Sequence, residues 1–287
     1  MIRKLIYVSL VVLVGIVGWV VWSECYPEGE KALRHDLCER VAAFFPEEME
    51  IDSADFGLFH RVPVEAPEVV VVLIHGLDDP GDIWDDLVVH WSSKAVDIWE
   101  FRYPNDQSVS ASALFLNREW AKLPLNQDYT LIAHSMGGLV AREFLGTQEG
   151  AEDVSKLIML GTPNQGSEWA RFRVWLELYD HFPNSEKRRL SLFSSLRDGC
   201  GEAKIDLRPN SFFLRKLNIR PMSHSIEVLT VAGVIGQEWI ERQLEARRSE
   251  KDTMVNEGLK QLRLSSEGLG DGVVSFESTR VDGFPMP

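Results

Sequence analysis

Long apolar runs that alternate with helical segments constrain the fold of this chain more than any other feature. Residues 69–74 read VVVVLI, and residues 129–133 form a second run just before a Gly-rich turn. Strands that are buried on both faces read as continuous apolar runs, whereas half-exposed strands alternate apolar and polar residues. The sequence therefore predicts an α/β fold with a mostly parallel central sheet covered by helices. The other expected elements are strands at 95–101, 156–160 and 227–232 and helices at 112–122 and 137–145.

Ser135 lies between the expected strand 129–133 and the expected helix 137–145. A serine at the tip of a tight strand-turn-helix junction is the arrangement of a nucleophile elbow, which requires small residues two positions before and after it. Ala133 and Gly137 occupy these positions. The pentapeptide alone occurs often by chance, so the prediction of Ser135 as a nucleophile depends on its place between strand and helix.

A serine nucleophile also needs backbone donors for the oxyanion that its attack creates. The segment Ile74-His75-Gly76-Leu77 ends the first apolar run, and Gly76 allows the backbone to approach a substrate closely. We expect the backbone N–H groups of Leu77 and Met136 to form the oxyanion hole.

The order of catalytic residues in such folds is serine, then acid, then histidine. Asp271, in the Gly-flanked turn Gly270-Asp271-Gly272, is the expected acid, although an aspartate between glycines is also a common turn former. His75 and His134 belong to the two backbone motifs, and we interpret both as structural residues.

Five segments together resemble the bacterial triacylglycerol-lipase and GPI inositol-deacylase group of α/β-hydrolases, over about residues 69–278. They are LIHGL at 73–77, AHSMGG at 133–138, LGTPNQGS at 160–167, DLRPNS at 206–211 and GDGVV at 270–274. The resemblance implies the α/β-hydrolase fold, Ser135 as nucleophile and Asp271 as acid. It also implies hydrolysis of a carboxylic ester of lipid type through an acyl-enzyme.

The chain departs from this group because no histidine follows Asp271. The remaining candidates, which all precede it, are His35, His60, His90, His181 and His224. Either the final strand and helix with the base are missing, which the featureless residues 283–287 favour, or another histidine has taken the role. The alternative to an active esterase is a catalytically impaired homologue that binds a lipid or a partner; an acyltransferase would use the same triad.

The N-terminus predicts a membrane anchor at residues 1–24. Residues 5–22 carry no charge and would span about 27 Å as a helix. Arg3 and Lys4 precede this run and three glutamates follow it, which places the remaining chain outside the cytoplasm. The alternative is a cleaved signal peptide and a secreted or periplasmic protein.

The rest of the chain divides into two expected parts. Residues 25–50 should form an amphipathic juxtamembrane helix, which packs on the domain or lies near the membrane surface. Residues 51–287 should form the hydrolase domain, with a helical cap inserted at about 167–225. The helix prediction rests on the apolar spacing of Leu33, Leu37, Val41 and Phe44.

Composition narrows the expected partners. The formal net charge of −14 disfavours nucleic acid as a partner. No metal-ligand motif is present, and the chemistry requires no cofactor. The three cysteines, Cys25, Cys38 and Cys200, do not form a disulfide scaffold, although a bridge between the first two is open.

Overall fold

The computed structural model describes residues 7, 14–15, 18–19, 21–49, 53–77, 79, 81–124, 127–147, 152–167, 200–223, 225–233, 274–275 and 277–281. The chain forms two compact units, Met1–Glu50 and Ile51–Pro287, which are described separately.

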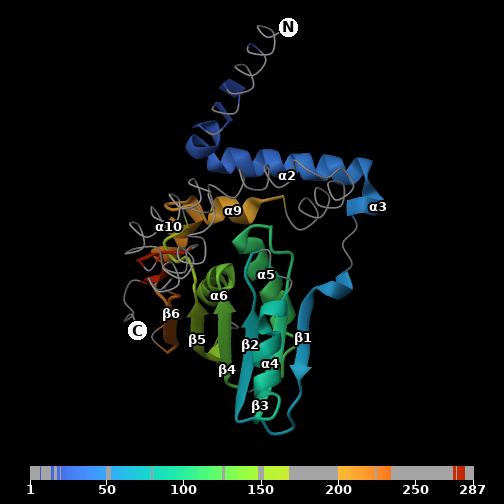
Figure 1. The fold of residues 1–287 in the computed structure, drawn as a ribbon, viewed down its shortest axis with the longest axis vertical. Coiled ribbons are helices and arrows are strands. Elements are labelled where there is room, and N and C mark those ends of the chain that lie inside the picture. The colour runs from blue at the N-terminus through green and yellow to red at the C-terminus, as the bar shows by residue number, and fades with distance from the viewer. Residues whose placement is uncertain are drawn as a thin grey trace, which may run out of the picture. The chain divides into compact units, whose positions relative to one another are not determined.

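The first unit contains helix α2 (Pro27–Phe44) and the short helix α3 (Pro46–Met49). Residues 21–25 are also helical, and the chain bends at Tyr26, whose backbone has φ −132° and ψ 59° (Figure 1). Pro27 then begins α2, where its missing N–H costs no hydrogen bond. The helix expected within residues 25–50 is therefore present. Within the described parts of the chain, no helix is both long and apolar enough to cross a membrane, and residues 5–22 lie mostly outside those parts.

The state of the cysteines differs from the Cys25–Cys38 disulfide that the sequence analysis considered. Cys25 is a free, exposed thiol, whereas Cys38 and Cys200 are disulfide-bonded. Cys38 lies well inside α2, and a helical rise of about 1.5 Å per residue separates it from Cys25 by far more than the ~7 Å that a disulfide tolerates. The suggested Cys25–Cys38 bridge is therefore wrong.

The second unit is built on a six-stranded sheet with the order β1-β3-β2-β4-β5-β6, and β1 and β6 lie at its two sides (Figure 1). All neighbouring pairs are parallel except β1 with β3. The mostly parallel sheet is thus confirmed. The strands are β1 (Gly57–Val62), β2 (Val69–Ile74), β3 (Val96–Arg102), β4 (Tyr129–His134), β5 (Val154–Leu160) and β6 (Glu227–Val231).

Central strand β2 shows why its sequence is apolar throughout. Val70, Val72 and Ile74 pack into the main core cluster on one face of the sheet, whereas Val71 and Leu73 pack into a second cluster with Trp84 and Val88. Successive side chains of a strand point to opposite faces, so a strand covered on both sides needs an apolar residue at every position.

The helices of the second unit cover both faces of this sheet. Helices α5 and α6 carry much of the main cluster, and α4 supplies Val88 to the second one. The described helices are α4 (Asp85–Trp91), α5 (Val109–Trp120), α6 (Met136–Thr147), α9 (Glu202–Asp206) and α10 (Phe212–Asn218), with 3₁₀ turns at Ser53–Asp55, Asp82–Trp84 and Glu277–Thr279.

The expected cap at 167–225 is described only in part. Residues 168–199 lie outside the described residues. Helices α9 and α10 follow them, and Phe213, Leu214 and Leu217 of α10 belong to the main core cluster. This end of the predicted insertion is therefore part of the domain core.

Candidate active site

Ser135 occupies a strained turn between β4 and α6. Its φ is +50°, a left-handed conformation that non-glycine residues seldom adopt. Two hydrogen bonds fix the turn: the Ser135 N–H donates to the carbonyl of Leu160 at 2.8 Å, and the Gly138 N–H donates to the carbonyl of Ser135 at 3.1 Å. The end of β5 and the first turn of α6 thus hold the backbone of Ser135, which is half-buried.

The glycines around Ser135 are there because three backbone segments meet. A Cβ atom on Gly137 would lie 2.4 Å from the carbonyl oxygen of His75, and one on Gly76 would lie 2.9 Å from the Cβ of Ser135. A Cβ atom on Gly138 would lie 2.0 Å from the hydroxyl of Thr162. The turn after β2, the turn after β4 and the loop after β5 are therefore packed together with no room for side chains.

The two predicted oxyanion donors come from turns that this packing brings together. Leu77 directly follows Gly76, and Met136 directly follows Ser135. The Met136 side chain is fully buried, and Leu77 packs against the main core. Both residues are thereby anchored through their side chains.

His75 is a structural residue, as the sequence suggested. Its Nδ1 donates to the carbonyl of Gly76 at 2.9 Å, and its Nε2 accepts from the N–H of Tyr103 at 3.4 Å. The rings of His75 and Tyr103 are stacked with centroids 4.4 Å apart, and the Tyr103 hydroxyl donates to the His75 carbonyl at 2.8 Å. Burial lowers the pKa of His75. A neutral imidazole therefore holds the turn that leads to Leu77.

Three of the histidines considered as general base have other contacts. His60 on β1 lies 2.7 Å from Asp97 and stacks on Trp99, and β1 is separated from β4 by two intervening strands. His90 on α4 lies 3.4 Å from the amine of Lys94, and His35 in the first unit pairs with Glu39. His181, His224 and the expected acid Asp271 lie outside the described residues.

The loop of residues 161–167 links the Ser135 turn to the chain that follows Asp271. Its first residue, Gly161, donates its N–H to the carbonyl of Val231 on β6 at 2.8 Å. Farther along, the Gln165 N–H donates to the Ser278 carbonyl at 3.0 Å, and the Ser278 hydroxyl donates to the Gly166 carbonyl. The described residues just after the expected acid thus dock beside the end of β5.

Asn164 is the centre of this loop and is completely buried. Its side-chain oxygen accepts from Arg142 of α6 at 2.9 Å, and its side-chain nitrogen donates to the carbonyl of Thr279 at 2.8 Å. Asn218 of α10 donates to the Asn164 backbone carbonyl at 2.9 Å. One amide side chain therefore joins the helix after Ser135 to the C-terminal segment, a role that the LGTPNQGS motif alone did not reveal.

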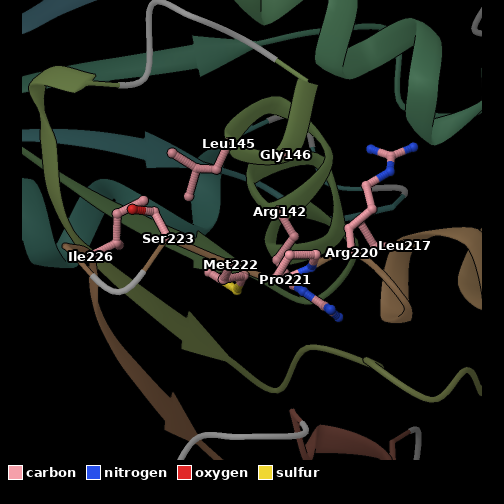
Figure 2. A pocket seen from close by; sticks show the side chains of 9 residues that line it. All are labelled: Arg142, Leu145, Gly146, Leu217, Arg220, Pro221, Met222, Ser223 and Ile226. Atoms are coloured by element: carbon pink, nitrogen blue, oxygen red, sulfur yellow. The ribbon is translucent and has the colours of Figure 1, made fainter.

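A small hollow lies farther along α6, between this helix, α10 and the loop before β6 (Figure 2). It encloses about 10 Å³, which is room for about one water molecule. Arg220 at its rim is held by Glu143 at 2.7 Å. Ser135 does not line the hollow, so the hollow is not a substrate site. Among the described residues, no group of acidic, histidine and cysteine side chains could hold a metal ion.

Comparisons with known proteins support the same fold. The family model for the PGAP1-like alpha/beta domain matches residues 116–256, which include Ser135 and the 161–167 loop. No curated protein matches the sequence.

Two solved enzymes share the fold at low sequence identity. The mature form of the Bacillus licheniformis lipase BlEst2 aligns with a TM-score of 0.55 and 19% identity, over 78% of this chain and 85% of that one. Its propeptide form aligns with a TM-score of 0.53 and 19% identity, over 78% of this chain and 46% of that one. A metagenomic carboxyl esterase, MGS0156, aligns with a TM-score of 0.50 and 19% identity, over 67% of this chain and 58% of that one.

The parallel sheet, the elbow and these likenesses define the chain as a protein with the α/β-hydrolase fold. The resemblance seen in the motifs is confirmed: the chain is similar to PGAP1-like domains, and its structural neighbours are lipases and esterases.

Proposed function

We propose that this chain is a serine hydrolase that cleaves carboxylic esters of lipase or esterase type. The observation that carries the proposal is the conformation of Ser135: a φ of +50° at the junction of β4 and α6, packed against Gly76. Holding a serine in such strained backbone is unfavourable, and a nucleophile elbow is the known use of this arrangement at this place in a parallel sheet.

In the proposed reaction, the Ser135 oxygen attacks the carbonyl carbon of the ester while its proton passes to an imidazole base. The N–H groups of Leu77 and Met136 stabilise the negative oxygen that forms. The carbon–oxygen bond to the alcohol then breaks, the alcohol takes the proton, and an acyl-enzyme remains. Water activated by the same base hydrolyses it and restores the Ser135 hydroxyl. Asp271 is proposed to orient the base.

The nature of the ester is also part of the proposal. The structural neighbours are named a lipase and a carboxyl esterase, and the sequence motifs resemble enzymes that act on lipid esters. A lipid-type ester is therefore the substrate class that we propose for this chain.

The experiment is labelling of the full chain with a fluorophosphonate probe, which phosphonylates an activated serine hydroxyl. Wild type should be labelled and Ser135→Ala should not, because the variant lacks the reacting oxygen. Ser92→Ala is the matched control, since Ser92 is exposed at the end of α4 and its hydroxyl donates to the carbonyl of Val89. Labelling that persists in Ser135→Ala would refute the assignment.

The same labelling assay can identify the histidine that acts as the general base. His181→Ala and His224→Ala should each be compared with wild type, because a general base contributes about 10²- to 10⁴-fold to such a rate. A folded wild-type chain that resists labelling and hydrolyses neither short- nor long-chain p-nitrophenyl esters would favour the catalytically impaired, lipid-binding alternative.

We also propose that residues 5–22 anchor the chain in a membrane, with the hydrolase unit outside the cytoplasm. The support is the absence of charge in this run, with Arg3 and Lys4 before it and glutamates after it. A reporter fused after Pro287 should be active only outside the cytoplasm; a reporter active only inside would overturn the orientation.

A further inference from the structure

Helix α2 and its N-cap residue Tyr26 carry a row of exposed apolar side chains. Tyr26, Leu33, Leu37 and Phe44 have 63%, 46%, 53% and 81% of their surface exposed. Their spacings of seven, four and seven residues place all four within about 20° of one line along the helix, since each residue turns it by about 100°. The row thus runs the length of α2, and Phe44 is its most exposed member.

The other exposed residues of α2 include charged side chains both beside this row and on the side of the helix opposite to it. Arg40 donates to Asp36 at 2.8 Å, and His35 lies 3.5 Å from Glu39. Single exposed apolar residues are ordinary, but several along one line of a helix, bordered by charged side chains, mark an interaction surface. A helix with an apolar line along one side and polar residues on the other is suited to the boundary between lipid headgroups and acyl chains.

The chain that enters α2 indicates which partner this is. Within the first unit, the helical residues 21–25 lead into α2 through the bend at Tyr26 (Figure 1), and residues 21–22 are the last two of the uncharged run 5–22. Trp19 and Trp22 near the end of that run have ring centroids 5.2 Å apart. Tryptophans at this place are typical of the membrane–water interface. Tyr26 lies one helical turn beyond Trp22, so α2 begins at the level of that interface.

We propose that α2 lies in the plane of a lipid bilayer surface, with Tyr26, Leu33, Leu37 and Phe44 inserted among the outer ends of the acyl chains. The inference rests on the proposed anchoring by residues 5–22, and it does not depend on the chemistry of Ser135. Helix α2 carries four acidic and three basic side chains, so it has no basic excess to attract anionic lipid. The partner is therefore a neutral, zwitterionic surface, and the contact depends on apolar burial rather than on charge.

The test measures the depth of single positions in the full chain, reconstituted in phosphatidylcholine vesicles. Cys25, the free thiol, is first replaced by Cys25→Ser, and an environment-sensitive fluorophore is attached after Leu37→Cys or Phe44→Cys. His35→Cys and Glu39→Cys, on the polar side of the same helix, are the matched controls. Each labelled chain is exposed to brominated lipids, which quench within the bilayer, and to aqueous iodide.

The probes at 37 and 44 should be quenched by brominated lipid several-fold more than those at 35 and 39, at low and at high salt alike. The inference would be overturned if chains that still float with the vesicles showed equal lipid quenching at all four positions, with every probe accessible to iodide. That result would leave the anchoring intact. Chains that do not float with vesicles would overturn both. Protection at 37 and 44 that appears without lipid and grows with protein concentration would show a second copy on this row, which also overturns the inference.

Discussion

Asp206 accepts a hydrogen bond from the backbone N–H of Val109 at 3.0 Å, and its carboxylate is buried. Val109 is the first residue of α5, whose N-cap Ser108 accepts from the N–H of Ala111. A residue from the end of α9 therefore completes the capping of a helix that lies 97 positions earlier. The Lys204–Asp106 ion pair, at 3.4 Å, ties the same two segments together.

Removing this carboxylate should destabilise the hydrolase unit. Asp206→Ala leaves a buried N–H without its acceptor at the positive end of a helix, and we expect a loss of about 2 kcal/mol in the free energy of unfolding. Asp206→Asn keeps an acceptor and should lose less. Urea unfolding of the full chain measures both. Glu65→Ala, at an exposed position, is the control and should stay within about 0.5 kcal/mol of wild type.

Gly138 and Thr162 should show strongly non-additive effects. In Gly138→Ala the new Cβ would lie 2.0 Å from the Thr162 hydroxyl and 2.7 Å from its methyl carbon, so we expect about 2 kcal/mol of destabilisation. Thr162→Ala removes the obstructing atoms, and the double variant should recover much of that loss. Thermal unfolding of the four chains gives the coupling. Additive losses would mean that the clash is relieved elsewhere.

The burial of the Thr162 hydroxyl leads to a separate prediction. It is buried, and it has no hydrogen-bond partner among the described residues. Thr162→Val keeps the shape and removes the polar atom, so its stability should equal or exceed that of wild type. A loss above about 1 kcal/mol in the same thermal assay would show that the hydroxyl does have a partner.

Asn164→Asp should loosen the C-terminal segment while it preserves the contact with α6. An aspartate still accepts from Arg142, but it cannot donate to the Thr279 carbonyl and would place two oxygens against each other. Hydrogen exchange of residues 277–281 should become faster, with β2 and β4 unchanged. If this segment positions the acid, fluorophosphonate labelling of Ser135 should slow as well. Unchanged exchange at 277–281 would contradict the role of Asn164.

The neutral state of His75 predicts a loss of stability in acid. Burial lowers its pKa in the folded chain, so below the ordinary value of about 6.5 the unfolded chain binds more protons than the folded one. The contribution of His75 is thus fully present above that pH and declines as the pH falls. His75→Asn, which keeps a donor for Gly76, should unfold with a flatter dependence between about pH 7 and 5. If the stability of His75→Asn fell with pH as steeply as that of wild type, the acid sensitivity would belong to other groups.

The elbow could be predicted from sequence because its determinants are local. Ala133 and Gly137 lie within two residues of Ser135, and the flanking strand and helix are strongly apolar. Strand β1 was not predicted because it is an antiparallel edge strand in which only Gly57 is buried. Local pattern also could not show that Asn164 reaches Thr279 or that Asp206 reaches Val109, because these pairs are set by tertiary packing.

The contact between Asn164 and Thr279 spans 115 positions of the chain, which has a consequence for synthesis. Strands β1 to β5 and the whole α6 helix leave the ribosome well before the residues that satisfy Asn164. Until then the side-chain N–H of Asn164 lacks its Thr279 acceptor, and a contact between residues so far apart in the sequence forms slowly. We therefore expect the region around Ser135 to be among the last parts of the hydrolase unit to become rigid.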